Sequence, residues 1–256
     1  MCPTTYWAGG LTGPPHGGRP TSLRALRRRP ETPDEELIGA QHGDVVSEIS
    51  DATRLERMQA ELAQGFRELG GVQRAVSVFG SARTAPGSPA YALAQLVGRR
   101  LGEAGFAVIT GGGPGAMEAA HRGAKDAEAQ TIALNIDLPF EQTPDAWTDI
   151  SLDFHYFFCR KVMFVRYASA FVVLPGGYGT LDELFEALCL IQVRKIRSFP
   201  VILIGVDYWS GLLAWLREQA LAEGTIAAAD LDLVHLTDDL DDVVERVLRA
   251  ELQQHG

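Results

Sequence analysis

Strand-length apolar runs alternate with helical patterns from about residue 75 to the end of the chain. The runs are apolar throughout rather than at every second residue, which is typical of strands covered on both faces. After the run at 171–174, for example, Leu181, Leu184, Leu188 and Ile191 recur at helical spacing. The alternation predicts an α/β fold, a Rossmann-like doubly wound parallel sheet with helices on both faces. The expected strands are 75–79, 106–110, 131–136, 171–174, 200–205 and 233–236.

Two segments are expected to precede this main domain, which takes residues 73–256. Residues 1–50 are predicted to be a disordered or poorly ordered extension, since the first 33 are rich in Gly, Pro and Thr and basic before Glu31. A basic docking arm or an organelle-targeting peptide is the alternative, but the glycines and prolines would interrupt an amphipathic helix. Residues 51–72 are predicted to form a packing helix. Residues 137–152 carry no assignable pattern.

The composition limits the classes of partner. The formal net charge is −10 over 256 residues and the sequence pI is near 5.1, which argues against a nucleic-acid polymer or an anionic membrane as the main partner. The three cysteines, Cys2, Cys159 and Cys189, have no metal-ligand spacing and suggest a reducing compartment. With no membrane-length apolar run and no signal-like N-terminus, we expect a cytoplasmic protein.

Glycine-rich turns follow three of the expected strands. They are Gly80-Ser81, Gly111 to Gly115, and Gly176 to Thr180 in the segment FVVLPGGYGTLDE. Glycines let the backbone approach an anion, and the first amides of the following helix point at it. Ligands of open α/β sheets bind outside the carboxyl ends of the strands. Three such turns therefore favour a phosphate-bearing ligand.

Two familiar nucleotide motifs match poorly. Gly111, Gly113 and Ala116 fit G-x-G-x-x-[GA], with Asp137 as a ribose partner, but this turn follows the second strand rather than the first. No lysine follows Gly179, so the later turn is not a Walker A loop.

Charged residues near the last glycine turn are candidates for chemistry. Glu183 lies three residues after Thr180, on roughly the same helix face, whereas Asp182 points elsewhere. Acids in a first turn also simply favour the helix dipole. Arg160 and Lys161 begin a helix, where a cation is unfavourable unless an anionic ligand or a carboxylate partner compensates; a surface ion pair is the alternative.

Other reactive side chains are given structural roles. Cys159 has no histidine placed by sequence to activate it, so we expect an inert thiol. His155 is expected to pack or to form a hydrogen bond. His121 is expected at the surface.

The motifs GGGPGAMEAA at 111–120 and RKVMFVRYASAFVVLPGGYGTLDE at 160–183 resemble those of the LOG family. Its members are cytokinin-activating nucleoside 5'-monophosphate phosphoribohydrolases, also described as lysine decarboxylase-like. The resemblance covers about residue 74 to the last helix. The form FHYFFxRK is similar to a bacterial branch, and it lacks the histidine that many plant members carry before the Arg-Lys pair.

The resemblance implies a Rossmann-like subunit that binds AMP-type nucleotides and works as a homodimer or higher homo-oligomer. It implies that Arg160 and Glu183 are the catalytic pair. It also implies substrate-binding roles for a larger set of residues: Ser81, Gly112, Gly113, Gly115, Lys161, Gly176, Gly177, Gly179 and Thr180.

The function expected from the resemblance is hydrolysis of the N-glycosidic bond of a purine nucleoside 5'-monophosphate, plain or N6-modified, to the free base and ribose 5-phosphate. Neither a cofactor nor a metal is expected. A non-catalytic carrier of a nucleotide-like or pterin-type phosphorylated ligand is the alternative. A decarboxylase lacks a convincing pyridoxal-phosphate lysine, and a dehydrogenase depends on the poorly matched fingerprint.

Overall fold

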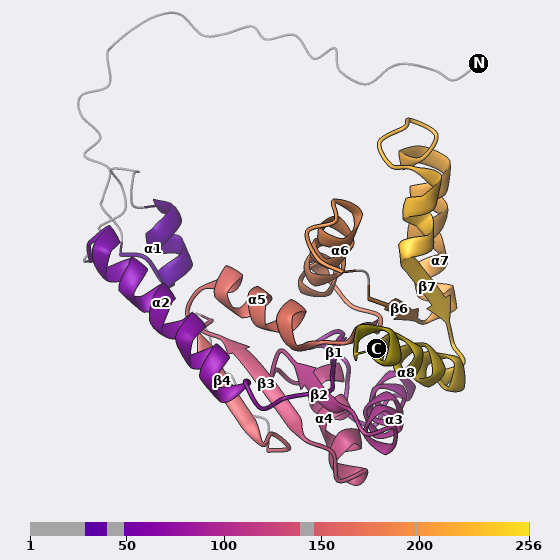
Figure 1. Cartoon of the computed structure of the whole chain (residues 1–256), viewed down its shortest axis with the longest axis horizontal. Coiled ribbons are helices and arrows are strands. Elements are labelled where there is room, and N and C mark those ends of the chain that lie inside the picture. The colour runs from indigo at the N-terminus through magenta and orange to yellow at the C-terminus, as the bar shows by residue number, and fades with distance from the viewer. Residues whose placement is uncertain (1–28, 40–48, 139–145, 198, 256) are drawn as a thin grey trace, which may run out of the picture.

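The computed structural model describes residues 29–39, 49–138, 146–197 and 199–255. Seven parallel strands form one sheet in the order β4-β3-β2-β1-β5-β6-β7, and helices lie on both of its sides (Figure 1). The predicted Rossmann-like α/β fold is therefore confirmed. The strands are β1 (Ala75–Phe79), β2 (Ala107–Thr110), β3 (Thr131–Ile136), β4 (Ile150–Phe154), β5 (Ala170–Val173), β6 (Val201–Ile204) and β7 (Val234–Thr237).

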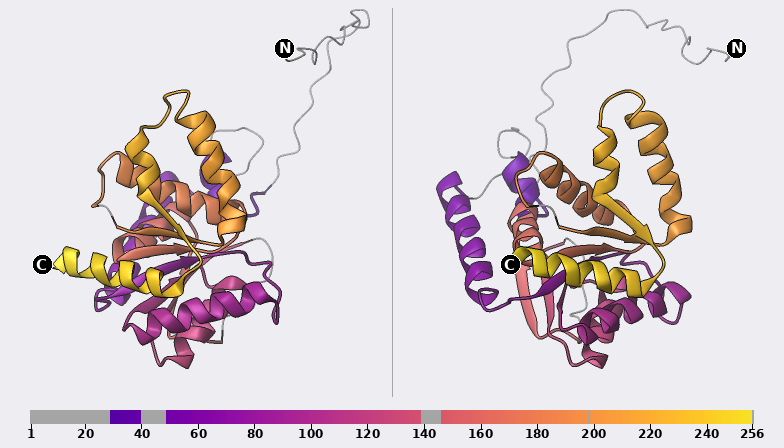
Figure 2. Two further views of the ribbon diagram at one scale, coloured as in Figure 1. Left: turned by 90° about the vertical axis from the view of Figure 1, so that its right-hand side faces the viewer. Right: turned by 45° about the vertical axis from the view of Figure 1, so that its right-hand side comes forward.

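The helices divide between the two faces of the sheet, as the two views of Figure 2 show. Helices α3, α4 and α8 pack on one face, and α2, α5, α6 and α7 pack on the other. Their bounds are α1 (Pro33–Gly39), α2 (Asp51–Glu68), α3 (Pro89–Glu103), α4 (Ala116–Asp126), α5 (Phe157–Tyr167), α6 (Tyr178–Gln192), α7 (Val206–Trp215) and α8 (Leu240–His255). A π-helical turn, Leu216–Ala220, follows α7, and a 3-10 helix, Ala228–Leu233, precedes β7.

The chain order reverses between β1 and β5. Strands β2, β3 and β4 are added on one side of β1, and β5, β6 and β7 on the other. Because all neighbours are parallel, the carboxyl ends of the strands lie at one edge of the sheet. A crevice is expected at that edge where the order reverses, between the turns that follow β1 and β5.

The main differences from the predicted elements lie at the sheet edge and near the N-terminus. Strand β4 was not expected, because its residues ISLDF are buried only at alternate positions, as suits an edge strand. Within the extension predicted to lack stable structure, Pro33–Gly39 forms α1. The rest of that extension, apart from residues 29–32, 49 and 50, lies outside the described residues, as does 139–145 of the unassigned segment. No helix within the described ranges is long and apolar enough to cross a membrane.

Candidate functional site

The three glycine turns meet at the carboxyl edge of the sheet. The amide of Ser81, after β1, donates to the carbonyl of Pro175, after β5, at 3.2 Å. The carbonyl of Ser81 accepts a bond of 3.0 Å from the amide of Ala116, the first residue of α4. The turns predicted separately from sequence are thus joined by main-chain hydrogen bonds at the point where the strand order reverses.

Two glycines of the β2–α4 turn are required by close contacts. Gly112 has a φ of +72°, and a Cβ there would lie 1.8 Å from Oδ1 of Asn135. Gly115 has a φ of +73°, and its Cβ would lie 2.6 Å from the carbonyl oxygen of Ser81. Gly113 faces the flexible end of Met117 instead. At Gly112 and Gly115 the packing of the fold explains the glycine without a ligand.

The β5–α6 turn contains both kinds of glycine. A Cβ at Gly176 would lie 2.1 Å from Oγ1 of Thr180, whose side chain is buried over the turn. A Cβ at Gly177 or Gly179 would meet nothing within 4 Å. The N-cap of α6, Gly177, has no side chain to cap the helix, so the first amides of α6 are free of side-chain capping. This open helix terminus is suited to bind an anion.

Glu183 is buried behind this turn. Its exposed fraction is 4 %, and Nζ of Lys161 lies 3.8 Å from its Oε1. Burial raises the pKa of Glu183 to about 7, although the positive charges of Lys161 and Arg160 lower it. The ionised carboxylate is therefore costly at this site, and it forms as the pH rises through about 7.

Lys161 is paired with carboxylates of α6. Its Nζ contacts Oδ2 of Asp182 at 2.9 Å and also Glu186, in addition to Glu183. Burial lowers its pKa, but the hydrogen bonds with Glu186 and Asp182 outweigh burial, so the pKa is raised. The sequence left open whether an anionic ligand or a carboxylate compensates the charge of Lys161, and the structure shows that carboxylates do so.

Arg160 differs sharply from its neighbour. Within the described part of the chain, its guanidinium forms no ion pair within 4.0 Å, and its buried Nε has no hydrogen-bond partner. It lies over the rings of Phe157 and Phe164, at 4.9 and 5.6 Å from the ring centres. Burial lowers the pKa of Arg160, and the charge of Glu183 is the largest influence that raises it. A Cβ on Gly111 would lie 3.8 Å from Nη1 of Arg160, so this side chain reaches the β2–α4 turn.

The site contains residues that the sequence reasoning missed. Asn135, near the end of β3, fits against Gly112 and donates to Oγ of Ser151 and Oδ1 of Asp153. A polar residue within the apolar run TIALNI was the available signal. Tyr208 donates to the carbonyl of Gly176 at 2.7 Å, and nothing in the local sequence indicated this contact.

The side chains that were given structural roles have mixed outcomes. Cys159 is buried, and burial raises the pKa of its thiol to about 12, so it is inert as expected. His155 Nδ1 lies 3.0 Å from Glu61, also as expected. His121 was wrongly predicted at the surface: it is fully buried, with Nε2 3.2 Å from the carbonyl of Ile132, because it lies on the inward face of α4.

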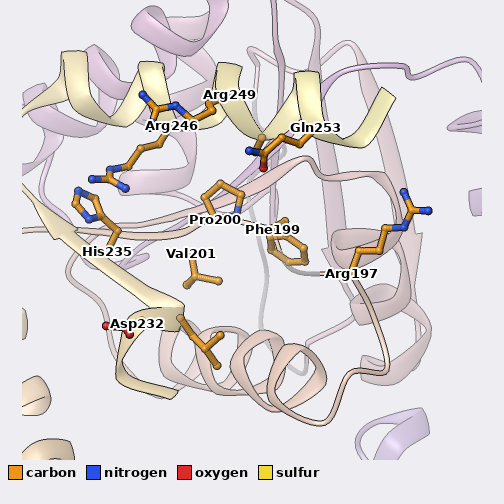
Figure 3. Close-up of a pocket in the computed structure, with 11 residues that line it drawn as sticks. Arg197, Phe199, Pro200, Val201, Asp232, His235, Arg246, Arg249 and Gln253 are labelled. Atoms are coloured by element: carbon orange, nitrogen blue, oxygen red, sulfur yellow. The ribbon is translucent and has the colours of Figure 1, made fainter. Parts of the chain in front are cut away.

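A cavity of about 460 Å³ lies elsewhere (Figure 3). Its walls include the beginning of β6 at Val201, Leu233 just before β7, and Arg246 and Arg249 of α8. This is the amino edge of the sheet, opposite to the glycine turns, so the cavity is not part of the candidate site. Among the described residues, His, Cys, Asp and Glu form no group of three or more that could hold a metal ion.

Fold and site define the class as open parallel α/β proteins whose glycine turns meet where the strand order reverses, the usual place for a ligand in this class. Residues 117–247 match the family model described as "Possible lysine decarboxylase". A probable cytokinin riboside 5'-monophosphate phosphoribohydrolase from Oryza sativa subsp. japonica is 30 % identical over 195 residues, which cover 73 % of this chain and 81 % of the relative. A second rice relative with the same description is 35 % identical over 60 % of this chain and 63 % of its own length. The chain belongs to the LOG and lysine decarboxylase-like superfamily.

Solved structures show the same fold. The Moco carrier protein from Chlamydomonas reinhardtii has a TM-score of 0.51 and 25 % identity, over 71 % of this chain and 99 % of that one. A molybdenum cofactor binding protein from Rippkaea orientalis has a TM-score of 0.51 and 24 % identity, over 69 % of this chain and 96 % of that one.

Proposed function

We propose that this chain hydrolyses the N-glycosidic bond of a purine nucleoside 5'-monophosphate, including N6-modified, cytokinin-type substrates. One observation carries the proposal: the buried carboxylate of Glu183 lies beside joined glycine turns, together with the guanidinium of Arg160, which has no ion pair among the described residues. The relatives named as phosphoribohydrolases support it. The bond between C1' and the base nitrogen breaks, water adds its oxygen to C1', and the base leaves with a proton derived from that water.

The 5'-phosphate is expected to bind at the beginning of α6. Gly177 and Gly179 leave open space there, and the amides of the first turn lack a capping side chain. Helix amides and the helix dipole both favour a phosphate at this position. Such anchoring would hold the ribose over the residues one turn further along α6, which include Glu183.

Glu183 is proposed to act as a carboxylate. Cleavage builds positive charge on the ribose, as in glycoside hydrolysis, and a fixed negative charge in a buried site stabilises it. The raised pKa means that the free protein holds a mixture of protonated and ionised Glu183 near neutral pH. We propose that the ionised form reacts and that it also orients the water.

The two cations are proposed to have different roles. The buried Nε of Arg160 has no acceptor in the described part of the chain, which favours contact with ribose or phosphate oxygens of the substrate. Lys161 already contacts three carboxylates. We therefore propose that it holds Glu183 in place, rather than binding the substrate as the resemblance implies.

The test is base release by the Glu183→Gln variant. Parent and variant would be incubated with AMP, isopentenyladenosine monophosphate, GMP and CMP, and the products separated by chromatography. Removing the charge while keeping the shape should lower turnover by at least about 100-fold and leave AMP binding within a few-fold. Glu245→Gln, on the exposed side of α8, is the matched control. Parent-like turnover of the Glu183 variant would disprove the proposed mechanism.

A carrier of a nucleotide-like or pterin-type phosphorylated ligand is the second candidate. The likeness to the Moco carrier protein, at 25 % identity, favours it specifically. A carrier would need the same glycine turns, so the fold does not separate the two functions. Binding of AMP in calorimetry without release of base from any of the four nucleotides would favour the carrier.

A further inference from the structure

The N-terminus of α5 is capped by carboxylates from α1 and α2, the two helices that precede β1. Its own N-cap residue, Tyr156, makes no side-chain cap. Instead, Glu61 of α2 accepts hydrogen bonds from the amides of His155 at 3.2 Å and Tyr156 at 3.4 Å. Asp34 of α1 accepts one from the amide of Phe157 at 3.3 Å. The amides at the beginning of α5 and just before it are thus bound by α1 and α2.

Helices α1 and α2 are fixed to each other and to α5. Arg54 of α2, only 3 % exposed, pairs with Glu36 of α1 at 3.3 Å. Against α5, Gly65 of α2 faces the side chain of Met163, whose Sδ would lie 2.6 Å from a Cβ at Gly65. Figure 1 shows α2 running alongside α5, with α1 near the beginning of both. The two carboxylates are therefore held in place by packing.

Arg160 depends on the same helix end. It is the fourth residue of α5, and its guanidinium lies over the ring of Phe157, whose amide Asp34 binds. A cation in the first turn is opposed by the helix dipole. The negative charges of Asp34 and Glu61 offset that repulsion, and the charge of Asp34 acts on Arg160 directly. The sequence pattern offered no signal for these contacts, because Glu61 lies 95 residues before Tyr156 and Asp34 lies 123 residues before Phe157.

We propose that Asp34 and Glu61 are positioning residues, which hold the first turn of α5 so that Arg160 points to the β2–α4 turn. The N-terminal helices would then form part of the active unit rather than a passive appendage. The role given to Arg160 rests on the proposed function, but the capping of α5 does not.

A double-mutant cycle tests the inference. Asp34→Asn and Glu61→Gln keep the side-chain shape but remove the charge and one acceptor oxygen. Each should lower kcat/KM for base release by at least about tenfold in the parent and by less than about twofold in an Arg160→Ala background. Glu56→Gln, an exposed residue of the same helix α2, is the matched control and should change neither background. Equal losses in both backgrounds would overturn the proposal, because the carboxylates would then act independently of Arg160.

The role of Asp34 and Glu61 can also be tested without the proposed hydrolysis. If the parent releases no base, the same non-additivity is expected in the AMP dissociation constant measured by calorimetry. Hydrogen exchange over residues 155–160 supplies a readout that needs no ligand: Asp34→Asn and Glu61→Gln should speed it, and Glu56→Gln should not. Because Asp34 is less buried than Glu61, its variant remains informative if Glu61→Gln fails to fold. Unchanged exchange in folded variants would overturn the capping role.

Discussion

Glu183 as a whole residue is 4 % exposed, and burial raises the pKa of its carboxyl group to about 7, although the positive charges of Lys161 and Arg160 lower it. In the sequence, this residue is one of two adjacent acids near the beginning of an expected helix. Burial separates them: the side chain of Asp182 is 55 % exposed and that of Glu183 only 5 %. The raised pKa of Glu183 therefore results from loss of contact with water, which cannot be predicted from the neighbouring residues in the sequence.

The pH dependence follows from that shift. If ionised Glu183 is the reactive form, kcat/KM should rise about tenfold per pH unit below pH 7 and level off above it. The substrate phosphate also titrates near pH 6, so a variant is needed to assign the midpoint. Lys161→Gln removes the largest charge that lowers the pKa of Glu183, and it should move the midpoint upward. A profile that falls as the pH rises, or a midpoint unaffected by Lys161→Gln, would contradict this assignment.

At the scale of the element, the β5–α6 turn combines a glycine needed for folding with glycines that leave room for a ligand. Gly176 has the side chain of Thr180 packed against it, whereas Gly177 and Gly179 face open space. The motif alone does not distinguish these roles. From the sequence, all three glycines were predicted to bind phosphate.

Alanine substitutions should separate the two roles. Gly176→Ala would place a Cβ 2.1 Å from Oγ1 of Thr180, so we expect a loss of about 1–3 kcal/mol in unfolding free energy, measured in urea. Gly177→Ala meets no neighbour and should leave stability within about 0.5 kcal/mol. Its effect should be confined to the AMP dissociation constant, measured by calorimetry. Equal destabilisation by both substitutions would argue against this division.

At the scale of the whole molecule, one face of the sheet is covered by helices in backbone contact. A Cβ on Gly98 of α3 would lie 1.9 Å from the carbonyl oxygen of Ala120 in α4, and one on Gly123 of α4 would lie 1.7 Å from that of Gln95. This contact fixes α4, whose first residue hydrogen-bonds to Ser81 of the site. The helix pair thereby links the covering layer to the turn that follows β1.

Gly98→Ala should disturb the entire domain. Backbone atoms cannot move aside as a side chain can, so we expect a loss of at least about 2 kcal/mol and a lower melting temperature. Gly211→Ala, on an open face of α7, is the control, and it should be neutral or stabilising by up to about 1 kcal/mol. Calorimetric melting of both variants provides the comparison. If the Gly98→Ala variant had the same melting temperature as the parent, α3 and α4 would have to be further apart than described.

The sequence by itself determined the parallel α/β architecture, since continuous apolar runs and helical spacing are local patterns imposed by burial on both faces. It also marked the glycine turns, and the resemblance singled out Arg160 and Glu183. The edge strand β4 escaped because only one of its faces is buried. Tertiary structure alone decided which glycines have close neighbours. It also decided that Lys161 pairs with three acids, while Arg160 pairs with none among the described residues. Finally, it decided that Asp34 and Glu61 cap α5. Those outcomes depend on groups distant in the chain, and on the desolvation that arises only when the helices pack together.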